Sequence, residues 1–86
     1  MFDTDQPEEV QLLCHMSTMK HILDHFGIDV KTEPIDVESF RANILVCTSS
    51  TFYRWIFGFN GKIKILGPES VQTAYREMLR KALEEL

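Results

Sequence analysis

Two histidines, His21 and His25, lie four residues apart, which is the spacing at which a helix presents two side chains on one face. Such a pair can chelate a metal, and the strong form of the motif adds a glutamate between the histidines and a third ligand elsewhere. Here Ile22, Leu23 and Asp24 stand between them. An exposed polar helix face explains the pair better, so we predict no metal and no cofactor.

Other patterns that could support catalysis are weak. The hydroxyl run from Thr48 to Thr51 precedes an apolar helical stripe, and helix capping explains these residues. The sequence contains no nucleophile elbow, no glycine-rich phosphate loop and no Cys/His cluster of metal-site spacing. We therefore expect a protein that is not an enzyme.

Length and charge narrow the class further. Eighty-six residues form one domain, and the net charge of −4 is unevenly spread, with −7 in residues 1–38 and +3 in residues 39–86. No apolar run is long enough to span a membrane, and the N-terminus lacks the pattern of a signal peptide. We expect a cytoplasmic protein with no membrane partner. Cys14 and Cys47 lie in apolar stretches, and we expect both to be buried free thiols.

The elements that position these residues follow the order β-α-β-β-α-β-α. Strands are predicted at 9–15, 28–35, 40–47 and 62–66. The first helix is predicted to be capped by Ser17 and stopped by Gly27, the second to carry the stripe 52–59, and the third to span 68–86. Pro34 lacks an N–H, so its strand should lie at a sheet edge, and Ile28 should point inward. The pattern predicts an α+β, ferredoxin-like βαββαβ sandwich, with a four-stranded antiparallel sheet, the first and third strands at its centre, and an added C-terminal helix.

Two surfaces of this predicted fold lack an obvious cover. The helix 68–86 carries an unbroken apolar stripe, and it can pack either on its own sheet or on a partner. The sheet face away from the helices mixes apolar with polar side chains, Leu13 and Leu45 among them. Tyr53 and Phe57 lie on the second helix, opposite its main stripe, with Arg54 adjacent to them. These side chains either pack under neighbouring elements or line a ligand pocket or subunit contact, and we take Tyr53, Arg54, Phe57, Leu13 and Leu45 as candidate ligand or interface residues.

The ordered set of local sequences carries a resemblance over essentially the whole chain. The segments are Val10-Gln11-Leu12-Leu13-Cys14, then Asp24-His25-Phe26-Gly27, Ser39-Phe40, Ser50 to Gly58, and Lys62 to Glu69. Together they resemble the C-terminal extension (WCX) domain of WYL-domain transcriptional regulators. The aromatic-x-x-Trp-x-Phe-Gly run followed by a short strand and Gly-Pro-Glu is the most specific part. Arg54 stands where the resemblance leads us to expect glycine in many relatives, and this departure bears on any shared ligand.

The resemblance implies a bacterial regulator with an N-terminal DNA-binding winged helix-turn-helix and a central WYL domain. We therefore expect residues 1–86 to be a single domain from the C-terminal part of a longer regulator, with a lead-in at 1–8 and the ferredoxin-like domain at 9–86. It would form a homodimer, bind DNA only through the absent domains, and respond to a small-molecule or nucleic-acid effector. The alternative is a free-standing small-molecule sensor of similar fold.

Overall fold

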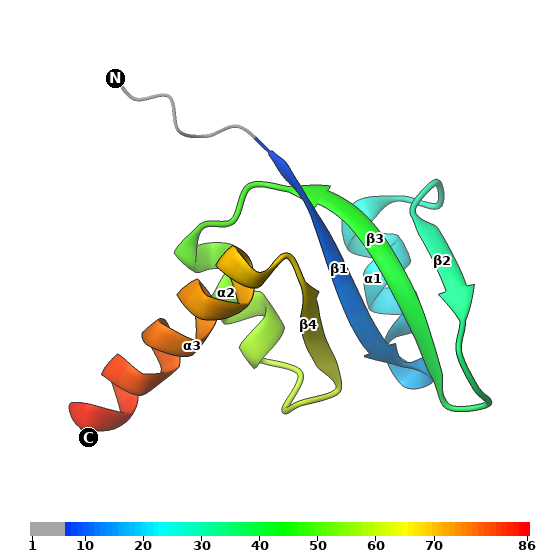
Figure 1. The fold of residues 1–86 in the computed structure, drawn as a ribbon. Helices are drawn as coiled ribbons and strands as arrows, with labels where there is room; N and C mark the ends of the chain where they lie inside the picture. The colour runs from blue at the N-terminus through cyan, green and yellow to red at the C-terminus, as the bar shows by residue number, and fades with distance from the viewer. Residues whose placement is uncertain (1–6) are drawn as a thin grey trace.

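A computed structural model of the chain describes residues 7–86. Residues 1–6, most of the expected lead-in, lie outside the described residues. The chain alternates strands and helices in the predicted order (Figure 1). The elements are β1 Glu8–His15, a 3-10 turn Met16–Thr18, α1 Met19–Phe26, β2 Lys31–Pro34, β3 Ser39–Val46, α2 Ser50–Phe57, β4 Ile63–Gly67 and α3 Glu69–Glu84.

The four strands form one antiparallel sheet in the order β2-β3-β1-β4. The first and third strands lie at the centre, as predicted. Val10 pairs with Ile44 and Leu12 with Ala42, so β1 and β3 run in register over their whole length. The structure therefore confirms an α+β domain with a four-stranded antiparallel sheet and three α-helices in the described chain.

Strand alternation builds the core on one face of the sheet. Val10, Leu12 and Cys14 are fully buried, because every second side chain of β1 points toward α1 and α2. The two helices place Ile22 and Ile56 against them. Each such side chain contributes roughly 1.5–3 kcal/mol by leaving water. The buried apolar residues are Val10, Leu12, Cys14, Ile22, Phe40, Ala42, Ile44, Phe52, Tyr53, Ile56, Ile63, Ile65 and Val71.

The start of the first helix differs from the prediction. Ser17 does not cap it, since Ser17 lies inside the 3-10 turn, where its backbone N–H donates to His15 Nδ1 at 3.1 Å. Thr18 is the residue before α1, and it makes no side-chain cap; its hydroxyl donates instead to the His15 carbonyl at 2.7 Å. The turn therefore buries Thr18 and delays the helix to Met19.

The second strand is shorter than predicted, and Ile28 is not inward but 85% exposed. The backbone of Gly27 takes φ +95, and the Val30 N–H donates to the Gly27 carbonyl, so residues 27–30 form a turn. The edge position of Pro34 is confirmed, because β2 pairs with β3 and ends the sheet.

The two cysteines have different environments. Cys14 is buried, as predicted, and burial raises the pKa of its thiol to about 12, although a hydrogen bond with Thr18 opposes this shift. Cys47 was predicted to be buried and is exposed. The prediction was wrong because β3 ends at Val46 and the chain turns there, with the Ser49 N–H donating to the Cys47 carbonyl.

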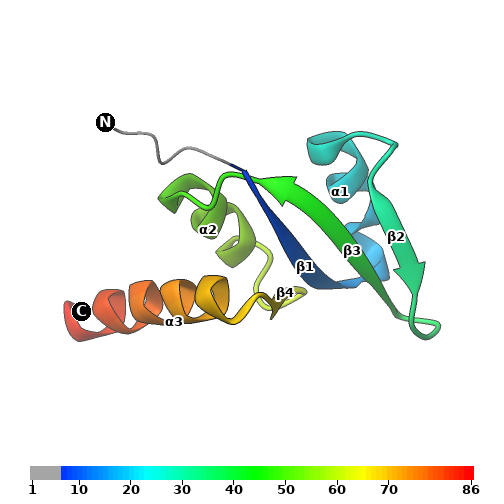
Figure 2. The ribbon, with the colours of Figure 1, turned by 45° about the horizontal axis from the view of Figure 1, so that its top comes forward.

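The third helix packs beside β4 at the edge of the sheet and continues beyond the body of the domain (Figure 2). Pro68 is its N-cap, with a cis bond from Gly67, and Val71 in its first turn is buried. The Gln72 side-chain amide donates to the Ile65 carbonyl of β4 at 2.8 Å. Within residues 7–86, no helix is both long and apolar enough to cross a membrane.

Candidate functional site

The structure places the five candidate residues in four different environments. Tyr53 belongs to the core, where its ring stacks on Tyr75 of α3 with a centroid distance of 5.5 Å. Burial raises the pKa of Tyr53; Glu8 adds to the rise, and a hydrogen bond with Thr48 opposes it. Burial also raises the pKa of Tyr75. The tyrosine pair therefore joins α2 to the first half of α3.

Phe57 lies at the end of α2 with 60% of its surface exposed. It borders an apolar groove of about 340 Å³ between α2, β4 and α3. Tyr75 and Leu79 form the α3 side of this groove, and Ile65 lies on the β4 side. The groove is open to solvent, and Asn60 and Lys64 lie at its border beside the aromatic and aliphatic side chains. Its mainly apolar lining can accept an apolar side chain from outside.

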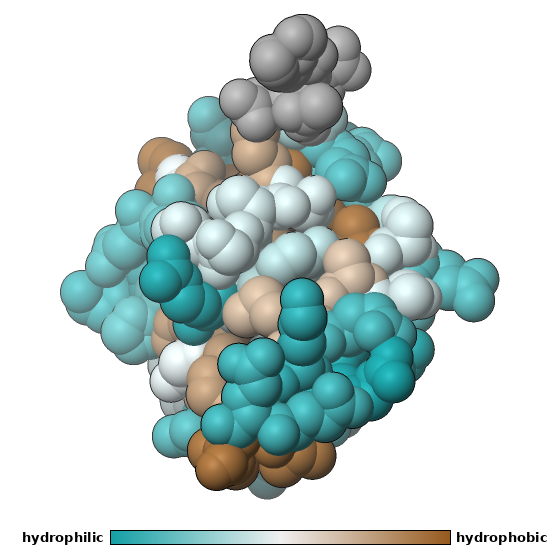
Figure 3. All heavy atoms as spheres, turned by 90° about the vertical axis from the view of Figure 1, so that its left-hand side faces the viewer, coloured by the Kyte–Doolittle hydropathy of each residue, from teal (hydrophilic) through white to brown (hydrophobic). Residues whose placement is uncertain are grey.

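The apolar stripe of α3 continues past this groove into solvent. Leu83 is 67% exposed and Leu86 is 99% exposed, whereas Val71 at the other end is 2% exposed. In Figure 3, which looks at this side of the molecule, hydrophobic atoms gather at the lower edge of the face, beneath a band of hydrophilic ones. We name the set formed by Phe57, Tyr75, Leu79, Leu83 and Leu86 the α2–α3 surface.

Leu83 and Leu86 were absent from the sequence-predicted site residues. Their signal was present in the stripe, since the helix was long for the domain and its apolar positions continued to the chain end. Periodicity places these residues on one helical face, but it does not predict whether the sheet extends far enough to cover them.

Arg54 is exposed on α2, and its guanidinium donates to the Thr51 hydroxyl at 3.5 Å, a long and weak bond. The charged group therefore remains available to solvent or to a partner. Its role in a contact stays a prediction.

Leu13 and Leu45 lie on the opposite side of the domain from the helices. Leu45 is 66% exposed and pairs with Glu9, while Leu13 is half-buried and pairs with Arg41 and Lys64. Four residues of β1 separate the two positions, roughly 13 Å along the strand. The open sheet face is therefore polar with separated leucines, and it shares no patch with Phe57. Its β1 and β3 residues are Glu9, Gln11, Leu13, His15, Ser39, Arg41, Asn43 and Leu45.

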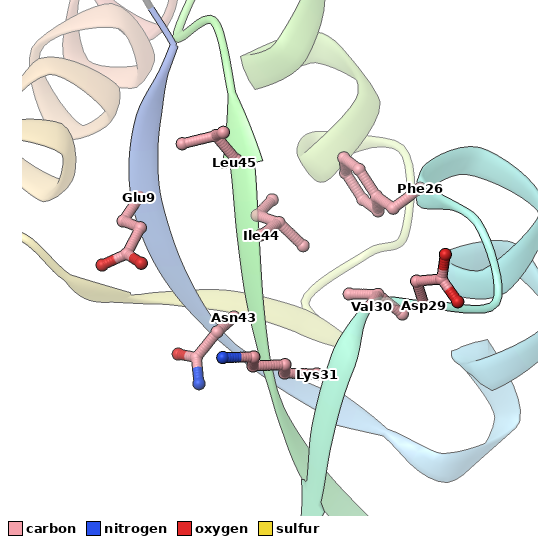
Figure 4. A pocket seen from close by; sticks show the side chains of 8 residues that line it. All are labelled: Glu9, Phe26, Asp29, Val30, Lys31, Asn43, Ile44 and Leu45. Atoms are coloured by element: carbon pink, nitrogen blue, oxygen red, sulfur yellow. The ribbon is translucent and has the colours of Figure 1, made fainter.

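Leu45 also borders a hollow of about 330 Å³. The hollow forms because β3 continues to Val46, while its pairing with β2 begins only at Asn43 and Lys31. Figure 4 shows the lining divided across the sheet, with Phe26 and Ile44 on one side of β3 and Glu9 on the other. The hollow is thus a notch at the sheet edge, with an apolar floor and charged rims.

The histidines lie exposed on α1, and each contacts an aromatic ring. His25 stacks on Trp55 at 4.6 Å with an interplanar angle of 23°, and His21 meets Phe59 edge-on at 5.3 Å. Among residues 7–86, no group of three or more His, Cys, Asp or Glu side chains could hold a metal ion. The pair's observed contacts are therefore with the aromatic cluster that joins α1 to α2.

The described chain is thus an α+β domain with a covered core, a largely polar open sheet face and a protruding amphipathic helix. The chain belongs to the WCX domain family, whose model matches residues 6–83. This domain is the C-terminal extension of WYL-type transcriptional regulators, and the chain is accordingly a regulatory domain of that class. Comparisons with curated proteins and with solved structures gave no match.

Proposed function

We propose that this domain assembles its regulator into a homodimer and acts by binding and not by catalysis, in the cytoplasm. The observation that carries the proposal is the α2–α3 surface, where Phe57, Leu83 and Leu86 hold apolar side chains in water. Contiguous exposed apolar groups at the end of a protruding helix are typical of protein contacts. In the assembled regulator, DNA would be bound through domains other than this one, and the packing of two copies would set the spacing of the DNA-binding domains.

The fold supports this role through the contacts that hold α3 on the domain. The strand order β2-β3-β1-β4 and the covering of one sheet face by α1 and α2 support a ferredoxin-like arrangement. A continuous core anchors the first half of α3 through Val71 and the Tyr53–Tyr75 stack. A displacement of α3 on one copy would therefore pass to the sheet and to the rest of the chain.

Light scattering of the 86-residue chain across concentration tests the assembly. A mass that rises from about 10 to about 20 kDa between low and high micromolar concentration is the expected result. A single mass of 10.0 kDa at every concentration would remove dimerisation from this domain.

A second candidate role, effector sensing, is favoured by the notch beside Leu45. Glu9, Asp29 and Lys31 surround the apolar side chains of Phe26 and Ile44, which suits a small amphiphilic molecule with charged groups. NMR spectra of the labelled chain with millimolar free amino acids test this role. Shifts confined to the notch would support sensing, by a free-standing domain or within a regulator, whereas unchanged spectra would count against amino acids as the effector.

A further inference from the structure

One end of the open sheet face holds a pocket that the proposed function does not use. There the end of β1 lies between the start of β3 and the residue before β4, since His15 pairs with Ser39 and its N–H donates to the Lys62 carbonyl (Figure 1). We name this hollow of about 240 Å³ the His15 pocket. Its lining includes His15, Ser39, Asn60, Lys62 and Lys64, and within the described chain no aspartate or glutamate borders it.

The two lysines bring positive charge to the His15 pocket. Lys62 and Lys64 stand on either side of the buried Ile63, so both side chains point to the open face, roughly 7 Å apart along the strand. In the described chain neither lysine forms an ion pair. Arg41, another cation on this face, is held by Glu33 at 3.0 Å. The pocket therefore has two ammonium groups whose charge no carboxylate of the described chain compensates.

His15 adds a neutral donor with a fixed orientation. Its Nδ1 accepts the Ser17 N–H at 3.1 Å, and the Ser17 hydroxyl lies 2.8 Å from the same atom. A ring nitrogen that accepts a hydrogen bond carries no proton, so the proton of the neutral imidazole is on Nε2. The 3-10 turn thus orients the ring and leaves its Nε2–H as the outer donor.

Two further donors come from separate parts of the chain. Ser39 supplies a hydroxyl from the start of β3, and Asn60 supplies a side-chain amide from the turn before β4. Asn60 has φ 55 and Gly61 has φ +88, so the chain reverses sharply here and brings Asn60 to the β1 end. The lining thus combines two positive charges with three neutral donors, which is the set that an anion requires.

We propose that the His15 pocket binds a small phosphate dianion, either the free ion or the phosphoryl group of a phosphomonoester. A phosphoryl group carries about −1.5 to −2 charges at pH 7 and three acceptor oxygens, which match two ammonium groups and three neutral donors. A carboxylate has one charge and two oxygens, so it would leave one ammonium group uncompensated. Leu13 also borders the pocket, where it would contact the carbon skeleton of a phosphomonoester.

Local charge, and not the charge of the whole domain, determines the affinity. The net charge of −4 repels anions at long range. At 0.1 M salt the screening length is about 10 Å, so the nearby lysines dominate the potential in the pocket. Because each exposed ion pair is weak, we expect a dissociation constant of about 1 mM, which rises with salt.

The proposal goes beyond assembly and does not depend on the homodimer. It is also separate from effector sensing at the notch beside Leu45, since the two hollows share no lining residue. Failure of either proposed role would therefore leave the His15 pocket in place, and its own failure would leave both of them in place.

An NMR titration of the labelled 86-residue chain with inorganic phosphate and phenyl phosphate tests the proposal, at an ionic strength held constant with sodium chloride. We expect saturating amide shifts at His15, Ser39 and residues 60–64, and acetate should bind at least about fivefold more weakly. Phenyl phosphate that binds at least about threefold more tightly than inorganic phosphate would assign a phosphomonoester, and equal affinity would assign the free ion. Shifts that do not saturate by about 20 mM, or acetate that binds equally well, would overturn the proposal.

Three variants locate the binding. The double variant K62Q/K64Q should weaken phosphate binding about tenfold, and K81Q, which changes an exposed lysine of α3 outside the pocket, should change it less than about twofold. S39A keeps every charge and should weaken binding about threefold through the loss of one donor. Circular dichroism should show all three folded. Affinity that is unchanged in the double variant, reduced equally by K81Q, or unchanged in S39A would overturn the pocket as the binding site.

Discussion

Helices α1 and α3 carry apolar stripes of the same kind but differ in what covers them. The α1 stripe faces the sheet, and Ile22 in its middle is fully buried between the helix and the sheet. The α3 stripe begins buried at Val71 and ends with Leu86 in water. The amphipathic pattern therefore identifies an apolar face on both helices. Whether the domain's own sheet covers that face depends on how far the sheet extends along the helix.

The comparison predicts unequal losses of stability. Phe40 is 1% exposed on a central strand, and F40A should lower the free energy of unfolding by about 3–5 kcal/mol through loss of burial and cavity formation. L86A, at the bare end of α3, should change it by less than about 0.5 kcal/mol. Urea unfolding at low protein concentration measures both. Similar losses would show that the end of α3 belongs to the folded core.

The stability of the buried core depends on pH through the Cys14 thiol. The folded-state pKa of Cys14 is raised to about 12 from an ordinary 9.0, so the unfolded chain loses this proton first as pH rises. The contribution of the protonated Cys14 thiol to the free energy of unfolding is complete below about pH 9. It is lost between about pH 9 and pH 12, at roughly 1.4 kcal/mol per pH unit in that window. Unfolding free energies at pH 8 and pH 10 measure the loss. C14A should retain only the smaller part that the buried tyrosines add, and an equal loss in C14A would refute this assignment.

The aromatic cluster between α1 and α2 gives a smaller effect. H25A removes the ring that stacks on Trp55, and we expect a loss of about 1 kcal/mol. Trp55 is the single tryptophan of the chain, so its fluorescence should also change in the folded state. K20A on the same helix is the control, because Lys20 is exposed and pairs only weakly with Asp24. Unchanged fluorescence in H25A would argue against the stacked geometry.

Amide hydrogen exchange in the wild-type chain compares the end of α3 with α2 directly. In dilute solution the amides in the last turn of α3 should exchange at least about tenfold faster than those of α2, since tertiary contacts hold α2 and not the end of α3. At high concentration, the proposed dimerisation should slow the exchange of the α3 amides selectively. Equal protection of both helices at low concentration would contradict the difference described above.

Much of the fold follows from local patterns in the sequence. Alternation along β1 and β3 predicts which side chains are buried, and the helical stripes predict α2 and α3 closely. The errors lie where a backbone turn determines whether a side chain is buried or exposed. Ile28 is exposed because Gly27 to Val30 form a turn, and Cys47 is exposed because the strand stops one residue earlier.

The candidate site was less predictable than the fold. Phe57 lies on the α2–α3 surface, but Tyr53 was assigned to the same side of the helix and lies beneath α3. Leu13 and Leu45 are on the open sheet face, apart from both. Local periodicity gives the side of an element on which a residue stands, whereas the position of α3 depends on long-range packing that no short window contains.

The hydrogen bond from Gln72 to the Ile65 carbonyl has a consequence for colloidal behaviour. It occupies an acceptor on the outer edge of β4, where another strand would otherwise attach. The other edge strand, β2, carries Pro34 and the charges of Lys31 and Glu33, which also oppose strand addition. With strand addition opposed at both edges of the sheet, a high protein concentration would not propagate a growing β-ribbon, and association would stop at small, closed complexes.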